Sequence, residues 1–505
     1  MKQLFLLILL FSTLTSVIKA QTLEEFKKQQ RQELNKFAKK EQQGIQSEQD
    51  KYLQYKMEAS AAFTKYLEEE WKAFNTFKAN PIPESVEPEQ IPVAPKRQRK
   101  KRTIHREHVD KILTPLTTLK AHKEEVILTL PLSQGVDKEG MAISEIPTYR
   151  FSFYGADLQI QIPNEWRNVK IDAPFSSKMI SNCYSKWSRL DIEAIKDQME
   201  AFRFQYNLND WAYYMLLSKV AATLFENQPN MTAMWTWFVL LNQEYDVRIA
   251  YDHKVVTLLI HTDVEAYRLP YMMLDNKRYY VTANKNGEWY TYNKQYDGAK
   301  NAINLTFSQP VNLNQDMVNR EVNFKYNRKP YQFHFAYNKN LIDFYNDYPS
   351  IAVQEYFITP TTEQMQKEMD NQLKPILDNM DSEQEKLSFL LSFVQEGFPY
   401  KRDVEQFGKE KYFYVEDMFA YPYSDCEDRS VLLSYMVRHY MRMQTLGVWT
   451  PGHMFVAVGL DPSKGDIVYY NTKQYTVCDP TYLGAKVGQG MPDAMKSKMS
   501  LIPCP

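Results

Sequence analysis

Three residues near the end of the chain could together form a nucleophilic centre. They are Cys426, His453 and Asp479, which supply a thiol, an imidazole and a carboxyl group in that order. Such a set attacks a carbonyl carbon, because the imidazole takes the thiol proton and the carboxyl group fixes the tautomer of the ring. The three residue types therefore predict a cysteine-dependent acyl-transfer site, provided that folding brings them together.

The segment around Cys426 predicts a helix that starts close to the thiol. Ser424 and Glu427 are three residues apart and precede an apolar run, so we expect Ser424 to be the N-cap and Glu427 its capping-box partner. Cys426 then lies in the first turn, where unpaired amide groups favour a thiolate. Asp425, Glu427 and Asp428 oppose the thiolate by charge repulsion, so a protonated histidine is needed nearby.

His453 is the best-placed histidine for this role. It follows a Pro-Gly turn signal and opens the apolar run HMFVAVGL, a pattern typical of a strand start. His439, in contrast, lies about three and a half turns beyond Cys426 on the expected helix, which is out of reach. Asp479 closes the next-but-one strand, KQYTVCD, directly before a proline. An acid at this place is expected to orient His453.

Two other interpretations of Cys426 remain. A cysteine at a helix start is commonly a small buried hydrophobe. Cys478 or Cys504 could also pair with it, or with each other, and the second pairing would leave Cys426 free. Four cysteines in 505 residues do not form a disulfide framework, so each one is judged singly.

The motifs DCED, GH followed by an apolar strand, and DPTY resemble, in this order and spacing, the transglutaminase-like branch of the papain-like cysteine fold. DCED is also similar to bacterial transglutaminase-like cysteine peptidases. The resemblance covers roughly Glu363 to the C-terminus. It implies Cys426 as nucleophile, His453 as general base and acid, and Asp479 as orienter. It also implies an amide or peptide bond as the target, cleaved through a thioester.

An oxyanion in such a reaction needs a second donor besides the backbone amide of Cys426. The papain-type pattern implies a glutamine shortly before the nucleophile, and the nearby candidates here are Gln406, Tyr421 and Tyr423. We select Gln406, and expect Tyr482 of DPTY to pack beneath the site. The sequence has no metal-ligand spacing and the motif needs no cofactor, so neither a metal nor a cofactor is expected.

Charge and length restrict the function classes. The 61 Lys and Arg residues nearly balance the 62 Asp and Glu residues, which gives no general attraction to nucleic acid or to anionic membranes. The first 20 residues, with Lys2, an apolar run and Ala20, have the layout of a signal peptide. An uncleaved anchor helix is the alternative. No later run approaches the roughly 18 apolar residues of a membrane span. We therefore expect an exported protein, either periplasmic or extracellular at the cell surface.

Residues 21 to 78 are polar, and their apolar residues recur mostly in steps of 11, which predicts a long, nearly straight amphipathic or coiled-coil helix. This helix either lies on its own domain or makes a homo-oligomer through residues 23–77. Residues 79 to 103 contain five prolines and end in six cations among seven residues. They are interpreted as a solvated, extended tether. Contact with phosphate-bearing envelope polymers is the alternative.

The rest of the chain predicts an α+β protein. Residues 104–277 form an α+β region, 278–360 a β-rich region ending in the strand AVQEYFI, and 361–505 the transglutaminase-like domain. The stretch WTWFVLLNQEYDVRIAYDHKVVTLLI has the same layout as the helix and strands around Cys426 and His453, but offers Met231 and Thr232 in place of a cysteine. Residues 104–277 are therefore a possible degenerate transglutaminase-like copy.

Two functions follow from these patterns. The first is an exported thiol enzyme acting on a protein or peptide substrate, by hydrolysis or by acyl transfer. The second is a catalytically silent surface scaffold, or a peptide-binding protein, assembled through its N-terminal helix.

Overall fold

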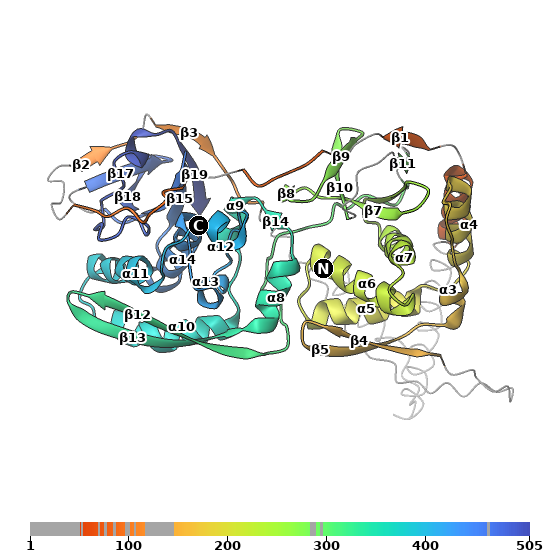
Figure 1. Ribbon diagram of the computed structural model, residues 1–505, viewed down its shortest axis with the longest axis horizontal. Coiled ribbons are helices and arrows are strands. Elements are labelled where there is room, and N and C mark those ends of the chain that lie inside the picture. Colours follow the sequence, from red (N-terminus) through yellow and green to blue (C-terminus); the bar gives the residue numbers. More distant parts are fainter. Residues whose placement is uncertain are drawn as a thin grey trace, which may run out of the picture. The chain divides into compact units, whose positions relative to one another are not determined.

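The computed structural model describes residues 51, 54–68, 71–74, 78–83, 87–95, 102–105, 108–116, 146–282, 289–292, 296–461 and 465–505. They form mixed helices and mainly antiparallel strands, as predicted at that level (Figure 1). The chain divides into two units, Met1–Tyr66 and Leu67–Pro505. The expected signal peptide lies outside the described residues. Among the helices within them, none is both long enough and apolar enough to cross a lipid bilayer.

The predicted N-terminal helix is described only in its last part. Residues 54–67 are helical, and strand β1 (Lys72–Phe74) follows shortly afterwards. The helix therefore ends at Leu67, and the prediction that it continues to Phe77 is wrong. The earlier positions of the 11-residue pattern, up to residue 50, lie outside the part of the chain that the structure describes.

Residues 148–292 form a first α+β repeat. It opens with the hairpin of β4 (Thr148–Phe153) and β5 (Ala156–Gln161), whose turn uses Gly155 at a positive φ of 78°. Short helices follow, α3 (Asn164–Asn168) and α4 (Ser177–Trp187), and then the longer α5 (Glu193–Gln205), α6 (Asp210–Leu224) and α7 (Pro229–Asn242). Helix α7 is apolar on all sides because it is buried against β6 (Val247–Tyr251) and β7 (Val256–His261).

The sheet of this repeat has the order β1-β11-β6-β7-β10-β9. Its remaining members are β9 (Tyr271–Leu274), β10 (Lys277–Val281) and β11 (Trp289–Thr291). A separate two-stranded pair joins β8 (Ala266–Tyr267) to β14 (Ser350–Ile351). The predicted helix and strands of WTWFVLLNQEYDVRIAYDHKVVTLLI are confirmed by α7, β6 and β7.

Residues 317–504 form a second repeat, and its elements were also mostly predicted. It opens with the hairpin of β12 (Met317–Tyr326) and β13 (Lys329–Asn338). Its helices are α8 (Lys339–Asp347), α9 (Val353–Ile358), α10 (Glu363–Leu377), α11 (Glu383–Gly397), α12 (Asp403–Phe407), α13 (Asp417–Ala420) and α14 (Cys426–Met436). Ser382 caps α11 by accepting from the amide of Glu385 at 3.2 Å.

A seven-stranded sheet completes this repeat, in the order β2-β17-β18-β16-β15-β19-β3. After a π-helical turn (Val437–Met441) come β15 (Thr445–Thr450), β16 (His453–Val458), β17 (Gly465–Tyr470), β18 (Lys473–Cys478), a 3₁₀ turn (Ala494–Lys496) and β19 (Met499–Cys504). Side chains from β15, β16, β18 and β19 make one of its apolar core clusters.

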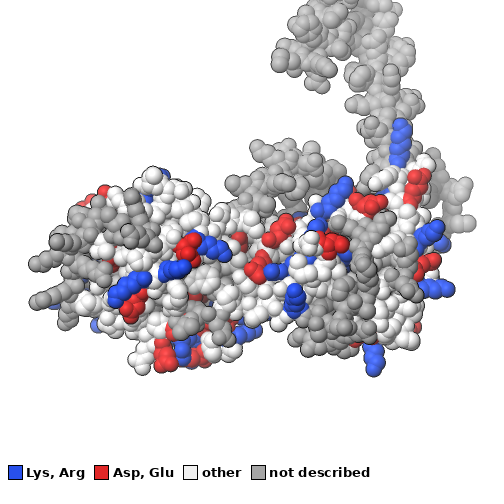
Figure 2. All heavy atoms as spheres, turned by 90° about the horizontal axis from the view of Figure 1, so that it is seen from above, with Lys and Arg blue, Asp and Glu red and all other residues white. Residues whose placement is uncertain are grey.

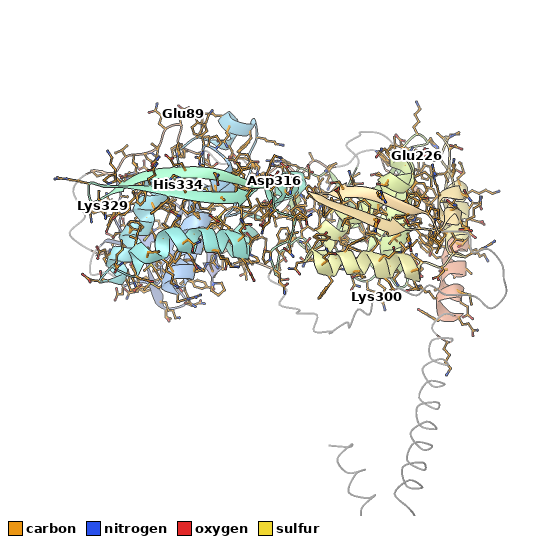
Figure 3. All side chains as sticks on the ribbon, turned by 90° about the horizontal axis from the view of Figure 1, so that it is seen from below. Glu89, Glu226, Lys300, Asp316, Lys329 and His334 are labelled. Atoms are coloured by element: carbon orange, nitrogen blue, oxygen red, sulfur yellow. The ribbon has the colours of Figure 1, made fainter. Side chains whose placement is uncertain are left out.

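The two repeats have the same topology. The sheet order β11-β6-β7-β10-β9 of the first corresponds, strand for strand and in chain order, to β19-β15-β16-β18-β17 of the second. In both, a hairpin packs on two helices, and the following helix packs on the two central strands. Figure 3 shows each hairpin lying across helices of its own repeat, with His334 and Lys329 on β13. The two repeats therefore share one strand order, and a degenerate transglutaminase-like copy in residues 104–277 stays a prediction.

The tether interpretation of residues 79 to 103 is wrong for the part that is described. β2 (Arg102–Ile104) pairs in parallel with β17, and β3 (Val109–Ile112) pairs in parallel with β19, so both edges of the second sheet come from before residue 113. Ile82 and Glu87 are buried. Open sheet edges carry unpaired backbone groups, and these short segments satisfy them.

The predicted strand AVQEYFI is also wrong, because Val353–Ile358 is helix α9. A short apolar run has no period that separates a buried strand from a buried helix. Here the tertiary environment decides, since α9 packs on α14 and β19. The β-rich region 278–360 accordingly contains two helices, α8 and α9.

Candidate active site

Cys426 lies in the first turn of α14, as the sequence predicts, but the helix is capped one residue later than expected, so Cys426 is its first residue. Asp425 is the N-cap and forms a capping box with Asp428, whose Oδ2 accepts from the Asp425 amide at 3.2 Å. The predicted box of Ser424 and Glu427 is therefore wrong. Ser424 instead accepts a hydrogen bond from Arg429 Nε at 3.2 Å. This shift leaves the Glu427 carboxyl group available to contact the thiol.

His453 and Asp479 lie together although distant in sequence. His453 begins β16 and Asp479 directly follows β18, and these two strands are neighbours in the sheet. Nε2 of His453 lies 2.9 Å from Oδ2 of Asp479, and both side chains are almost completely buried. Oδ1 of Asp479 accepts from the amides of Thr481 and Tyr482 at 3.1 and 3.0 Å. The carboxylate is therefore held in place by its own loop.

Asp479 also sets the charge of the ring. Burial lowers the pKa of His453, but the Asp479 carboxylate and its hydrogen bond outweigh burial, and the net pKa is raised. Nδ1 of His453 is buried and has no hydrogen-bond partner among the described residues. Helix α14, which begins with Cys426, packs on β16, which begins with His453. The ring thus keeps one nitrogen for a partner other than Asp479.

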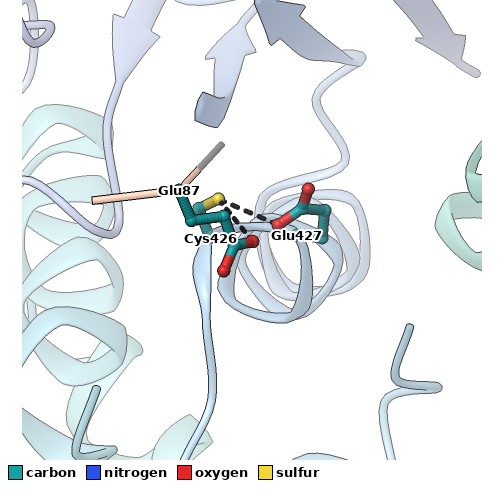
Figure 4. Close-up of side chains that lie close together, drawn as sticks. All are labelled: Glu87, Cys426 and Glu427. Atoms are coloured by element: carbon teal, nitrogen blue, oxygen red, sulfur yellow. Dashed lines mark hydrogen bonds between the residues drawn. The ribbon is translucent and has the colours of Figure 1, made fainter. Parts of the chain in front are cut away.

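The thiol of Cys426 is hydrogen-bonded to two carboxyl groups. It donates to Oε2 of Glu427 at 2.8 Å and to Oε1 of Glu87 at 3.3 Å (Figure 4). No hydrogen bond joins the sulfur to the His453 ring in the described structure. Burial raises the pKa of the Cys426 thiol well above its usual range, and Glu427, Glu87 and Asp425 raise it further. In this arrangement the sulfur is a neutral, fully buried thiol.

The acids around Cys426 could also hold a cation. Within the described ranges, three groups of buried ligand atoms lie within 4.8 Å of one another: Glu87, Cys426 and Glu427; Glu87, Glu410 and Asp425; Asp403, Asp425 and Asp428. Burial and mutual repulsion raise the pKa of Glu87 and of Asp425. Carboxylate oxygens are ligands for a hard divalent ion such as Ca²⁺. The expectation of a metal-free site stays a prediction.

Gln406, the predicted oxyanion donor, lies on α12, and its side-chain amide has no hydrogen-bond partner in the described structure. Its role stays a prediction. The structure instead reveals Gln395 on α11, which the sequence analysis missed. Its Nε2 donates to the carbonyls of Asp479 and Tyr482 at 2.9 and 3.0 Å, and its Oε1 accepts from Gly484 at 3.2 Å. Gln395 therefore fixes the loop that carries Asp479.

Arg429 is a second residue that the sequence analysis missed. It is completely buried on α14, and its guanidinium donates to the carbonyls of Phe398, Pro480 and Gln395. The available signal was an arginine inside an apolar helix, three residues after Cys426. Arg429 thus links the start of the helix to the loop after Asp479.

The suggested disulfides do not form, since all four cysteines are free and buried. Cys478 ends β18 and Cys504 ends β19, and strands β16 and β15 lie between them. Strands β18 and β19 are therefore three strand spacings of about 4.8 Å apart. This distance is roughly twice the Cα separation that a disulfide spans.

The first repeat has none of the three reactive groups at the corresponding positions. The positions that correspond to the helix start, the strand start and the end of the third strand hold Pro229, Val256 and Thr282. Pro229, rather than Met231 or Thr232, begins helix α7. This repeat therefore cannot do cysteine chemistry at that place.

No family model matches the chain, and neither the curated proteins nor the solved structures include a significant match. On the face drawn in Figure 2, acidic and basic side chains are interspersed, in keeping with the balanced charge of the sequence.

Proposed function

We propose that the protein is an exported thiol enzyme of the transglutaminase-like kind, which acts on an amide or peptide bond of a protein substrate through a thioester on Cys426. The carrying observation is the buried His453–Asp479 pair, with Nε2 to Oδ2 at 2.9 Å and Nδ1 unpaired, on the strand against which the Cys426 helix packs. A buried histidine with only a structural role is expected to have both ring nitrogens hydrogen-bonded.

The reaction follows from the roles of these groups. His453 takes the proton of the Cys426 thiol, the sulfur attacks the carbonyl carbon, and the backbone amide of Cys426 stabilises the oxyanion. The imidazolium, held by Asp479, then gives its proton to the departing amine, which leaves a thioester. Water or a second amine completes hydrolysis or transfer. Gln406 remains the proposed second donor to the oxyanion.

A thiol-directed activity probe tests this proposal. We expect wild type and Cys183→Ala to be labelled equally, because Cys183 is a buried free thiol of the first repeat. We expect Cys426→Ala to remain unlabelled while its Tm matches that of wild type, and His453→Ala to remain unlabelled at temperatures where it is still folded. Equal labelling of wild type and Cys426→Ala would end the enzyme proposal.

One observation favours the silent alternative, a scaffold or peptide-binding protein. The Cys426 thiol is fully buried and donates to two carboxyl groups, a state in which it attacks nothing. In this alternative the N-terminal helix assembles the protein. Concentration-dependent association should then be lost when residues 21–78 are deleted, and a monomer in both forms would exclude that role.

A further inference from the structure

Residues 87–95 contact the site although they precede it by more than 300 positions. Glu87 is 6% exposed and accepts the thiol hydrogen of Cys426. The carbonyl of Pro88, the next residue, accepts a hydrogen bond from the hydroxyl of Tyr400 at 2.7 Å. One end of this segment is therefore anchored directly on the nucleophile.

The other end is held by backbone pairing. The amide of Leu483 donates to the carbonyl of Pro92, and the amide of Ala94 donates to the carbonyl of Leu483, both at 2.8 Å. Val93 and Leu483 are partners in a parallel β-bridge. Leu483 belongs to the loop that follows Asp479. The segment therefore binds as an added strand does, through its main chain, a mode that tolerates many side chains.

A cavity of about 760 Å³ lies along this segment. Ile91 and Ala94 line one side, and Phe398, Tyr400 and Lys486 line the other. The segment contains Pro88, Pro92 and Pro95, which keep it extended and reduce the entropy that it loses on docking. This groove is therefore walled partly by the segment itself and partly by the second repeat.

We propose that this groove is the docking surface for an extended protein substrate, and that residues 87–95 are its resident ligand, placed across Cys426. The inference rests on the proposed function. A substrate carbonyl must come within about 3.5 Å of the sulfur, and the Glu87 side chain now takes that place. Because the segment is tethered, its effective concentration is on the order of millimolar, so a free substrate competes poorly until the segment leaves.

A disulfide between the segment and the loop tests the docking. In Val93→Cys/Leu483→Cys the two thiols replace bridge partners, whose backbones are about 5 Å apart, within the span of a disulfide. The readout is the rate at which iodoacetamide alkylates Cys426 in the folded full chain, measured on the peptide that contains it. We expect a rate at least tenfold lower after oxidation than after reduction. Val93→Cys alone, treated identically, should show no such change.

Weakening the hydrogen bond between Tyr400 and Pro88 should have the opposite effect and raise the alkylation rate of Cys426. Tyr400→Phe removes the hydroxyl that binds the Pro88 carbonyl, and we expect Cys426 to be alkylated several-fold faster with little change in Tm. Adding a peptide with the sequence of residues 87–95 should slow the reaction again, and a scrambled peptide should not. Equal alkylation in the oxidised and reduced double variant, or equal protection by both peptides, overturns the inference.

Alkylation measures access to the sulfur and needs no turnover, so the two proposals fail separately. If Tyr400→Phe is alkylated quickly but consumes no protein amide, the groove remains a peptide-binding surface and the enzyme proposal fails. If access does not depend on the segment while the activity probe still labels Cys426 selectively, the docking inference alone fails.

Discussion

Nε2 of His453 is bound to Oδ2 of Asp479 at 2.9 Å across 26 residues of sequence, because β16 and β18 are adjacent strands. From this pair we predict how the pKa of the His453 ring changes when Asp479 is replaced. In Asp479→Asn the carboxylate is lost and only the weaker attraction of the Glu427 carboxylate opposes burial, so the pKa of His453 should fall. NMR titration of histidine-labelled protein measures this fall. Asp493→Asn, at an exposed position, should leave the His453 titration unchanged; a wild-type titration in Asp479→Asn would show that the carboxylate does not control the ring.

We expect the buried carboxyl group of Glu416 to make the free energy of unfolding depend on pH. Burial raises its pKa from 4.5 to about 7, although its carboxylate accepts from the Thr362 amide at 2.8 Å. The folded chain therefore keeps a proton that the unfolded chain releases above pH 4.5. The stabilisation that this bound proton gives to the folded chain is complete below pH 4.5 and is lost as the pH rises through about 7. Between these two values the free energy of unfolding falls by about 1.4 kcal/mol per pH unit.

In Glu416→Gln this decrease in the free energy of unfolding with pH should vanish, because glutamine keeps an acceptor for the Thr362 amide but does not titrate. Urea unfolding at several pH values between 4.5 and 8 measures the difference from wild type. Glu363→Gln, whose side chain is 86% exposed, is the matched control and should follow wild type. A Glu416→Gln curve parallel to that of wild type would contradict the assignment.

Gln395→Ala should destabilise the protein and loosen the loop that carries Asp479. Its Nε2 serves three buried carbonyls, and each unsatisfied group costs about 1–3 kcal/mol, so we expect a loss of at least about 3 kcal/mol in the free energy of unfolding. Gln384→Ala, at an exposed position on the same helix, should cost less than about 0.5 kcal/mol. Equal losses in the two variants would show that Gln395 has no special role.

A chelator should leave the protein unchanged, because thiol, imidazole and carboxylate chemistry needs no metal. We expect EDTA to alter neither Tm nor the alkylation rate of Cys426. A fall of several degrees in Tm, reversed by Ca²⁺ and absent in Glu410→Gln, would contradict this expectation. It would assign the ion to the buried acids Glu87, Glu410 and Asp425.

Much of the fold could be predicted because it is local. The helices that begin at Glu363 and Glu383 show capping residues and apolar periodicity, and the strand that begins at His453 follows a turn signal. The strand prediction for AVQEYFI failed because a seven-residue run has no decisive period. The capping box failed by one residue because several acids in SDCED can serve as caps.

The order of Cys426, His453 and Asp479, the helix start and the strand start were determined by the sequence alone, since caps, turns and apolar periods act over a few residues. Only the tertiary structure decided that Glu87 covers the thiol, that Gln395 holds the Asp479 loop and that short N-terminal segments close both edges of the sheet. The most distant of these contacts pairs Val109 with Met499, 390 residues later. Their free energy comes from burial and from pairing of backbone groups that no local pattern records.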